Sequence, residues 1–242
     1  MLKFLRHIRQ TSLSENKLSK YLLYAVGEII LVVIGILIAI QVNNYNEKKK
    51  ERIKEKAFLR EINLDFKSNK EQLDSIMEYN KVSLHAARRL QEILKKFDPT
   101  NPEVTAANKK FADSIGYYNN LVWRNKSFNP KNGTVEALLN SSSFDLITND
   151  TLRRNLISWR DVLGDYLEEE QFGQQFLFNE YGPWARANID PENAIALFRV
   201  QHQNFVFKRT GDLHNTMTMA REEGIFKMID DIIRLTEPAN LD

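Results

Sequence analysis

Residue types that commonly carry catalysis or bind metals are few in this chain. The four histidines include no pair at the i, i+4 spacing that places two ligands on one helix face: His7, His85, His202 and His214. Cysteine is absent, which excludes thiolate metal sites, cysteine nucleophiles and disulfides. The nine glycines are scattered singly and form no phosphate-binding loop. We therefore predict no catalytic residue, no metal and no cofactor.

Other charged and aromatic groups favour structural roles. The acidic run Glu168, Glu169 and Glu170 is typical of a solvated helix face. Large aromatic side chains more often form a core than a ligand cage, and we expect core positions for Trp123, Trp159, Trp184, Phe128, Phe144, Phe172 and Phe176. A buried pocket that holds Arg124, Arg160 or Arg186 without a carboxylate partner would instead favour a ligand site.

The longest apolar stretch runs from Tyr21 to Val42, YLLYAVGEIILVVIGILIAIQV. A helix rises ~1.5 Å per residue and a bilayer core is ~30 Å thick, so about 20 apolar residues suffice to cross it. A cleaved signal peptide is the main alternative, but large residues such as Ile36 and Ile38 stand where cleavage requires small ones. We therefore predict an uncleaved transmembrane helix over residues 21–42.

Within this span, Glu28 and a stripe of small residues form the candidate membrane-association site. An acid inside a span is costly and usually has a partner or a task. Glu28 is either tolerated, by snorkelling, protonation or pairing with Lys20 or a neighbouring arginine, or it contacts a partner. Gly27, Gly35 and Ala39 recur on one helix face, where two backbones can approach closely. These positions predict association between copies through the span.

Basic residues flank the span on both sides, whereas the chain after residue 99 is mildly acidic. Lysine and arginine near anionic headgroups contribute ~1 kcal/mol each, so the lipid bilayer is the expected partner. The acidic distal half argues against nucleic acid binding. The positive-inside rule is nearly balanced, because the run from Glu47 to Lys56 rivals the basic N-terminal tail. Polar residues that separate this run from the span favour a cytoplasmic N-terminus and an exported domain.

Apolar spacing predicts helices along the rest of the chain. Apolar residues recur mostly every three, four or seven positions from Ile53 to Phe97, which indicates one long amphipathic helix. Because the spacing drifts from a strict heptad, this helix either pairs between copies as a coiled coil or packs on the chain's own bundle. Further helices are predicted at about 105–119 and, after the polar loop WRNKSFNPKNG, at 134–139. A longer helix is predicted from a cap at Thr148 or Asn149 to near Gly182 and Pro183. Another helix is predicted to start at Pro191, and a last helix carries Leu213 to Leu235.

The predicted fold class is all-α. A transmembrane helix continues into a long amphipathic stalk helix, and an antiparallel helical bundle follows. The expected domains are a basic amphipathic tail over residues 1–20, the transmembrane helix over 21–42, the stalk helix over 43–98 and the remainder of the bundle over 99–242.

Two segments carry a resemblance to a known family. The first is the opening, KFLRHIRQ followed by KYLLYAVGEIILVVIGILIAIQVNNYNEKKK, and the second is NGTVEALLNSSSFDLITNDTLRRNLISW, from Asn132 to Trp159. The chain resembles a family of single-pass membrane proteins from Bacteroidota that carries only a domain-of-unknown-function label, with Ser143 and Trp159 where a small residue and tyrosine are expected. The resemblance implies a bacterial inner-membrane location and a helical domain, and it supplies no activity.

Three classes of function follow as hypotheses. The first is a non-enzymatic interaction or scaffold protein of the cell envelope, which associates with itself through span and stalk and presents its bundle to an envelope protein. The second is an extracytoplasmic sensor that binds a small ligand near Trp123, Trp159 or Trp184 and signals through a partner. The third is an enzyme of unfamiliar type, which a concave cluster of perturbed acids or histidines would favour. The scarcity of chemical motifs favours the first.

Overall fold

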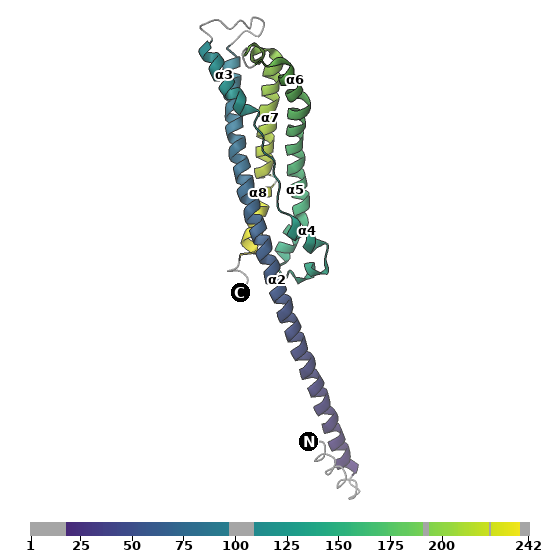
Figure 1. The fold of residues 1–242 in the computed structure, drawn as a ribbon. Coiled ribbons are helices and arrows are strands. Elements are labelled where there is room, and N and C mark those ends of the chain that lie inside the picture. Colours follow the sequence, from purple (N-terminus) through teal and green to yellow (C-terminus); the bar gives the residue numbers. More distant parts are fainter. Residues whose placement is uncertain (1–17, 97–108, 191–193, 223, 238–242) are drawn as a thin grey trace. The chain divides into compact units, whose positions relative to one another are not determined.

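A computed structural model describes residues 18–96, 109–190, 194–222 and 224–237 of the chain (Figure 1). Contacts divide the chain into two units, Met1–Glu55 and Lys56–Asp242, and each is described by itself. The elements of the described part are helices, which confirms the all-α fold class. The predicted basic tail lies outside the described residues, apart from the backbone of residues 18–20.

The first unit contains the N-terminal part of α2, a helix from Leu18 to Leu94. No glycine or proline follows Gly35 within it, so nothing interrupts its backbone hydrogen bonds. Every side chain from Val26 to Lys54 is exposed. Among the described residues, α2 is the one helix that is long and apolar enough to cross a membrane by length and composition.

The second unit is a helical bundle that includes the C-terminal part of α2 (Figure 1). Its helices α5, Asp150–Phe176, and α7, Val200–Glu222, run antiparallel. Gly173 in α5 lies beside Arg209 of α7, and Trp184, which follows α5 along the chain, stacks on His202, which precedes Arg209 in α7. The two contacts therefore occur in opposite order along the two segments. The remaining elements are α3 Lys109–Val122, α4 Gly133–Leu139, η2 Ser142–Leu146, η3 Leu177–Tyr181, α6 Gly182–Asn188, η4 Ala194–Phe198 and α8 Ile225–Leu235.

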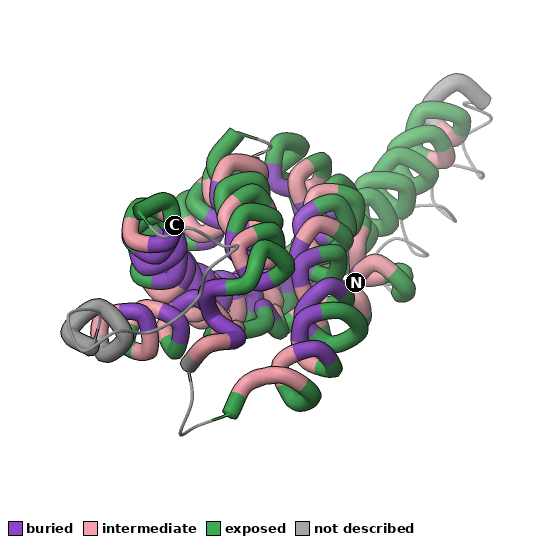
Figure 2. Tube along the Cα trace, turned by 90° about the horizontal axis from the view of Figure 1, so that it is seen from above, coloured by how far each residue is buried: buried purple, intermediate pink, exposed green. Residues whose placement is uncertain are grey.

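The largest core cluster joins α2, α5, α7 and α8, with buried residues facing inward (Figure 2). Phe66 of α2 and Trp159 of α5 are both buried, with ring centroids 4.9 Å apart in an edge arrangement. The apolar face of α2 from Leu59 to Leu94 is thus covered by the chain's own helices. Of the two alternatives for the stalk helix, the structure shows packing on the chain's own bundle. Ile53 of that predicted face is exposed.

Smaller core clusters fix α3 and η4 against the end of α2. Leu90 of α2, Ile115 of α3 and Phe198 of η4 are buried together. The predicted helix at 105–119 is confirmed as α3, and residues 105–108 lie outside the described residues. The predicted turn at 134–139 is confirmed as α4. The predicted cap is also confirmed, because the Asn149 side chain accepts the N–H of Leu152 at 2.9 Å.

The predicted helix end at Gly182 and Pro183 is wrong. The backbone stays helical from α5 through η3, a π-helical turn, into α6. Proline lacks an N–H and its ring crowds the preceding turn, and a π turn is wider than an α turn. The N–H of Gly182 donates to the carbonyl of Leu177, and a Cβ at position 182 would lie 2.9 Å from that oxygen. Only glycine fits this approach.

The predicted last helix is two helices. α7 ends at Glu222 and α8 begins at Ile225, because Gly224 has a φ of 90°. Glycine adopts this left-handed conformation readily, and it ends the α-helical path. The apolar spacing continues across the break, so the sequence pattern hid it. The predicted helix start at Pro191 lies outside the described residues, and η4 is described from Ala194.

Candidate functional site

The predicted membrane-association positions lie on the exposed part of α2. Gly27, Glu28, Gly35 and Ala39 are all exposed, and a Cβ added at either glycine meets no atom within 4 Å. With ~3.6 residues per turn, the three small residues fall within about 120° of one another around the helix axis. A second helix therefore has open access to this face. Association through it stays a prediction.

Tyrosines lie at both ends of the apolar segment. Tyr21 and Tyr24 are at its start, and Tyr45, which is 70% exposed, follows its end. At ~1.5 Å per residue, Tyr21 and Tyr45 are about 36 Å apart along the helix, which is the ~30 Å hydrocarbon core plus a short interfacial margin. Tyrosine favours the membrane–water interface at both leaflets. The pattern is typical of a membrane-spanning helix.

In the bundle, an extended segment, residues 123–132, connects α3 to α4 alongside α2 and α5 (Figure 1). We call this segment the strap. Extended backbone outside a sheet must find other partners for its N–H and C=O groups. Helix side chains supply them. The Asn69 amide of α2 donates to the carbonyl of Lys131 at 3.0 Å and accepts its N–H at 2.7 Å, and Gln72 accepts the N–H of Asn129 at 2.9 Å.

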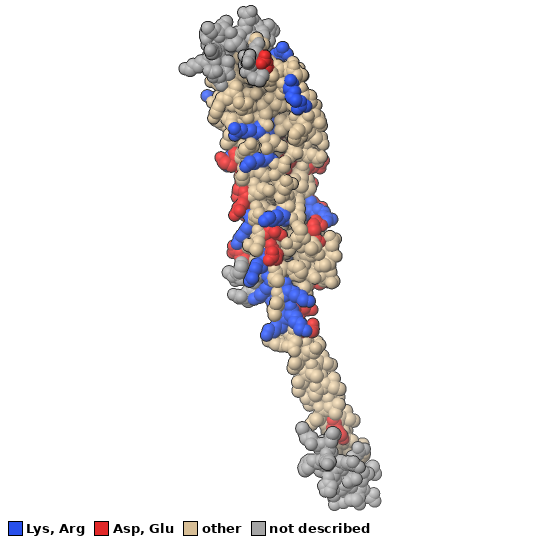
Figure 3. Space-filling view, in the orientation of Figure 1, with Lys and Arg blue, Asp and Glu red and all other residues tan. Residues whose placement is uncertain are grey.

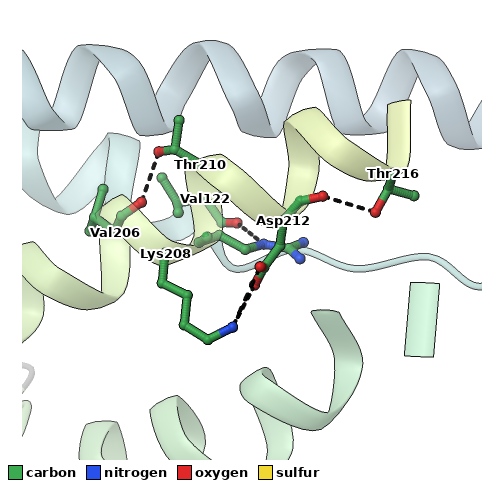
Figure 4. A network of polar contacts seen from close by, with 7 residues as sticks. Val122, Val206, Lys208, Thr210, Asp212 and Thr216 are labelled. Carbon is green, nitrogen blue, oxygen red and sulfur yellow. Dashed lines mark hydrogen bonds and ion pairs between the residues drawn. The ribbon is translucent and has the colours of Figure 1, made fainter. Parts of the chain in front are cut away.

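Arg209 of α7 binds the end of α3 and the start of the strap. Its Nε donates to the carbonyl of Val122 at 3.3 Å (Figure 4). Its Nη2 donates to the carbonyl of Arg124 at 2.9 Å. Burial lowers the pKa of the Arg209 guanidinium to about 10, opposed by the charge of Asp212. The guanidinium remains charged at neutral pH. A buried cation is thus balanced by carbonyl dipoles and a nearby carboxylate.

Glu170 of α5 binds the middle of the strap. Its two carboxylate oxygens accept the N–H of Phe128 at 3.1 and 3.2 Å. Burial raises the pKa of the Glu170 carboxyl, opposed by hydrogen bonds from Phe128 and Gln174. The Phe128 ring packs edge-on against Tyr166 at 5.8 Å. Burial and the charge of Glu170 raise the pKa of the Tyr166 hydroxyl, which is buried without a hydrogen-bond partner among the described residues.

A second polar cluster surrounds His202 of α7. Its Nδ1 lies 2.8 Å from the carbonyl of Leu197, and its Nε2 lies 2.8 Å from Oδ1 of Asn119, which also accepts the indole N–H of Trp123 at 2.7 Å. A neutral imidazole has one N–H and can donate to only one of these oxygens. Burial lowers the pKa of His202 to about 4, opposed by the Leu197 carbonyl. The side chain is therefore neutral at pH 7, with Trp184 stacked on it.

These buried polar groups hold other parts of the chain in place. Asn69, Glu170 and Arg209 bind main-chain groups of the strap and its approach, and His202 lies between a carbonyl and an amide. Within the described ranges, no three histidine, aspartate or glutamate side chains lie close enough to hold a metal ion. The arrangement can fix an irregular segment on helices without β-sheet pairing.

The structure places the residues singled out from the sequence as follows. Trp159, Trp184, Phe128 and Phe176 are buried, as predicted, and Trp123 and Phe144 are half-buried. The core prediction is wrong for Phe172, which is 58% exposed. The solvated-face prediction is wrong for Glu170, which is buried. Arg124, Arg160 and Arg186 are exposed, and Arg160 pairs with Glu136, so they form no buried cationic pocket.

Sequence reasoning missed Asn69 and Arg209, although a signal was present. Asn69 stands three residues after Phe66 and four before Leu73, and Arg209 stands between Val206 and Leu213 at the same helical spacing. Each is a polar residue inside an otherwise apolar stripe. A polar group at such a position is buried and needs partners, so it indicates a segment that must be held there.

The chain is therefore an all-α protein, and among its described helices α2 is the one that is long and apolar enough to cross a membrane. It belongs to DUF6090, a family of unknown function, whose model matches residues 28–179. The match extends from the predicted span into η3, and it confirms that the chain is a member of an uncharacterised family. No curated protein and no solved structure matches the chain.

Proposed function

We propose that this protein is a non-enzymatic, membrane-anchored interaction or scaffold protein of the bacterial cell envelope. One observation carries the proposal: the large apolar side chains from Leu22 to Val42 are all exposed on α2, from 47% at Val33 to 78% at Leu23. A continuous apolar surface of this length is unfavourable in water and favourable in a bilayer core. The tyrosines at either end support the same placement.

The span holds the helical bundle at the membrane, where it meets an envelope protein. The polar contacts that fix the strap support a non-enzymatic role, because the buried Glu170, Asn69 and Arg209 already bind main-chain groups of the chain itself. The resemblance to Bacteroidota proteins supports an inner-membrane location. The polar residues that separate the basic run after the span from the apolar segment support a cytoplasmic N-terminus and a periplasmic bundle.

Protease added to spheroplasts of cells that express the full chain is expected to digest the bundle. The physical reason is that the domain after Gln41 is then on the outer side of the inner membrane. An immunoblot against a C-terminal tag measures the result, and a cytoplasmic marker protein that stays intact serves as control. Complete protection of the tag in sealed spheroplasts, with digestion after detergent, would reverse the proposed topology.

Copies of the chain are proposed to associate weakly and in parallel through Gly27, Gly35 and Ala39. Lipid provides no hydrophobic drive between spans, so close packing along small residues must supply the contact. Replacing Gly35 and Ala39 by leucine is expected to lower crosslinking between copies in membranes severalfold. The matched control replaces Ile36 and Ile40, next to these positions on the helix, by leucine. Equal crosslinking in all three proteins would show that the stripe does not carry the contact.

A further inference from the structure

We propose that Lys48, Lys49 and Lys54 form a binding site for anionic phospholipid headgroups. The inference rests on the proposed membrane placement of residues 21–42. The three lysines are exposed on α2, and no described acidic side chain lies within ion-pair distance of any of them. Figure 3 shows Lys and Arg side chains gathered where the uncharged surface of α2 ends.

Some of the charged side chains in this segment form ion pairs within the helix, and others do not. The acids Glu47, Glu51 and Glu55 recur every four residues and form one stripe. Glu47 pairs with Lys50 at 2.9 Å, and Glu55 pairs with Arg52. Those two bases each have a carboxylate partner on the same helix. No such pairing is seen for Lys48, Lys49 and Lys54 among the described residues, so these three are the bases available to an external anion.

The positions of these lysines along α2, just beyond the predicted span, indicate that lipid headgroups are the anions they meet. Tyr45 marks the membrane–water interface, and Lys48 and Lys49 follow it by ~4.5 and ~6 Å of helix rise. They therefore lie at the outer edge of the headgroup layer, which extends about 5–8 Å beyond the hydrocarbon core. Lys54 lies about 14 Å beyond Tyr45, where its flexible side chain can turn back toward the headgroups. The field of anionic headgroups extends about 8–10 Å at physiological salt, so it reaches this side chain.

The test measures lipid selection around the full chain in vesicles of phosphatidylcholine and phosphatidylglycerol. Spin-labelled forms of each lipid report the relative association constant of the two lipids at the protein surface. We expect phosphatidylglycerol to be preferred about fivefold at low salt, with the preference lost at 1 M NaCl. The variant K48Q/K49Q/K54Q is expected to lower the ratio at least about twofold, because only the other basic residues that flank the span then remain, and K48R/K49R/K54R is expected to keep it.

A matched control separates local binding from net charge. The variant K95Q/K96Q/K227Q removes the same charge from exposed lysines outside this segment and is expected to keep the preference. An equal loss in the control variant, or an unchanged ratio in K48Q/K49Q/K54Q, would overturn the site. Flotation of the same vesicles after carbonate treatment reports insertion separately. A chain that fails to float contradicts the proposed membrane placement, whereas an inserted chain without lipid preference contradicts the lysine site alone.

Discussion

Replacing Trp159 by alanine is expected to lower the free energy of unfolding of the bundle by about 3–5 kcal/mol. The side chain is 2% exposed and packs on Phe66, so its removal leaves a cavity between α2 and α5. Its indole N–H also donates to Oδ1 of Asn132 at 2.9 Å, at the end of the strap. Urea unfolding of the full chain in detergent, followed by far-ultraviolet circular dichroism, measures the change.

The matched control is Ile157→Ala, two residues earlier on α5. Ile157 is 55% exposed, so its truncation is expected to cost at most about 0.5 kcal/mol. A loss below about 1 kcal/mol in Trp159→Ala would contradict the packing of α5 on α2. Comparable losses in both variants would contradict the assignment of the two helix faces.

Acidification from pH 6.5 to pH 4 is expected to remove about 3 kcal/mol of stability through His202. The pKa of His202 is about 4 in the folded chain, below the ordinary value of 6.5. Between these values the unfolded chain binds the proton and the folded chain does not. Stability is therefore present above pH 6.5 and falls as the pH drops through this window. Urea unfolding of the full chain at several pH values measures it.

The contribution of His202 is isolated by comparison with the variant His202→Gln. Glu170 acts in the opposite direction, because its pKa is raised in the folded chain, and it is present in both proteins. The variant is expected to lose the steep decline between pH 6.5 and pH 4. His214→Gln, which changes an exposed histidine, is expected to keep it. An identical pH dependence in the wild type and His202→Gln would show that His202 titrates normally.

Local pattern predicted the elements whose stability comes from a continuous stripe or a local cap. Apolar positions such as Ile62, Phe66 and Leu73 recur at helical spacing along α2, and they are buried in the bundle. Asn149 caps α5 by accepting the backbone N–H of Leu152, three residues further along the chain. The apolar segment of 21–42 needs no tertiary partner to be recognised. These features depend on residues close in sequence, so spacing and residue type suffice to predict them.

Features that depend on distant contacts could not be predicted in this way. The strap is an irregular segment whose order comes from Asn69, Glu170 and Arg209, each on a different helix. The continuation of helix through Pro183 depends on a π turn that the sequence pattern does not reveal. The break at Gly224 interrupts a stripe that stays apolar on both sides. In each case the local sequence pattern is compatible with the predicted element, and contacts between distant residues determine the conformation that the chain adopts.

Alkaline carbonate extraction of membranes that contain the full chain, followed by the intact mass of the extracted protein, tests the central claim most directly. The claim is that residues 21–42 remain in the chain and cross a bilayer. The account predicts that the protein stays in the membrane pellet and that its mass includes the span. Release into the supernatant, or a chain that begins after Ala39, would contradict it.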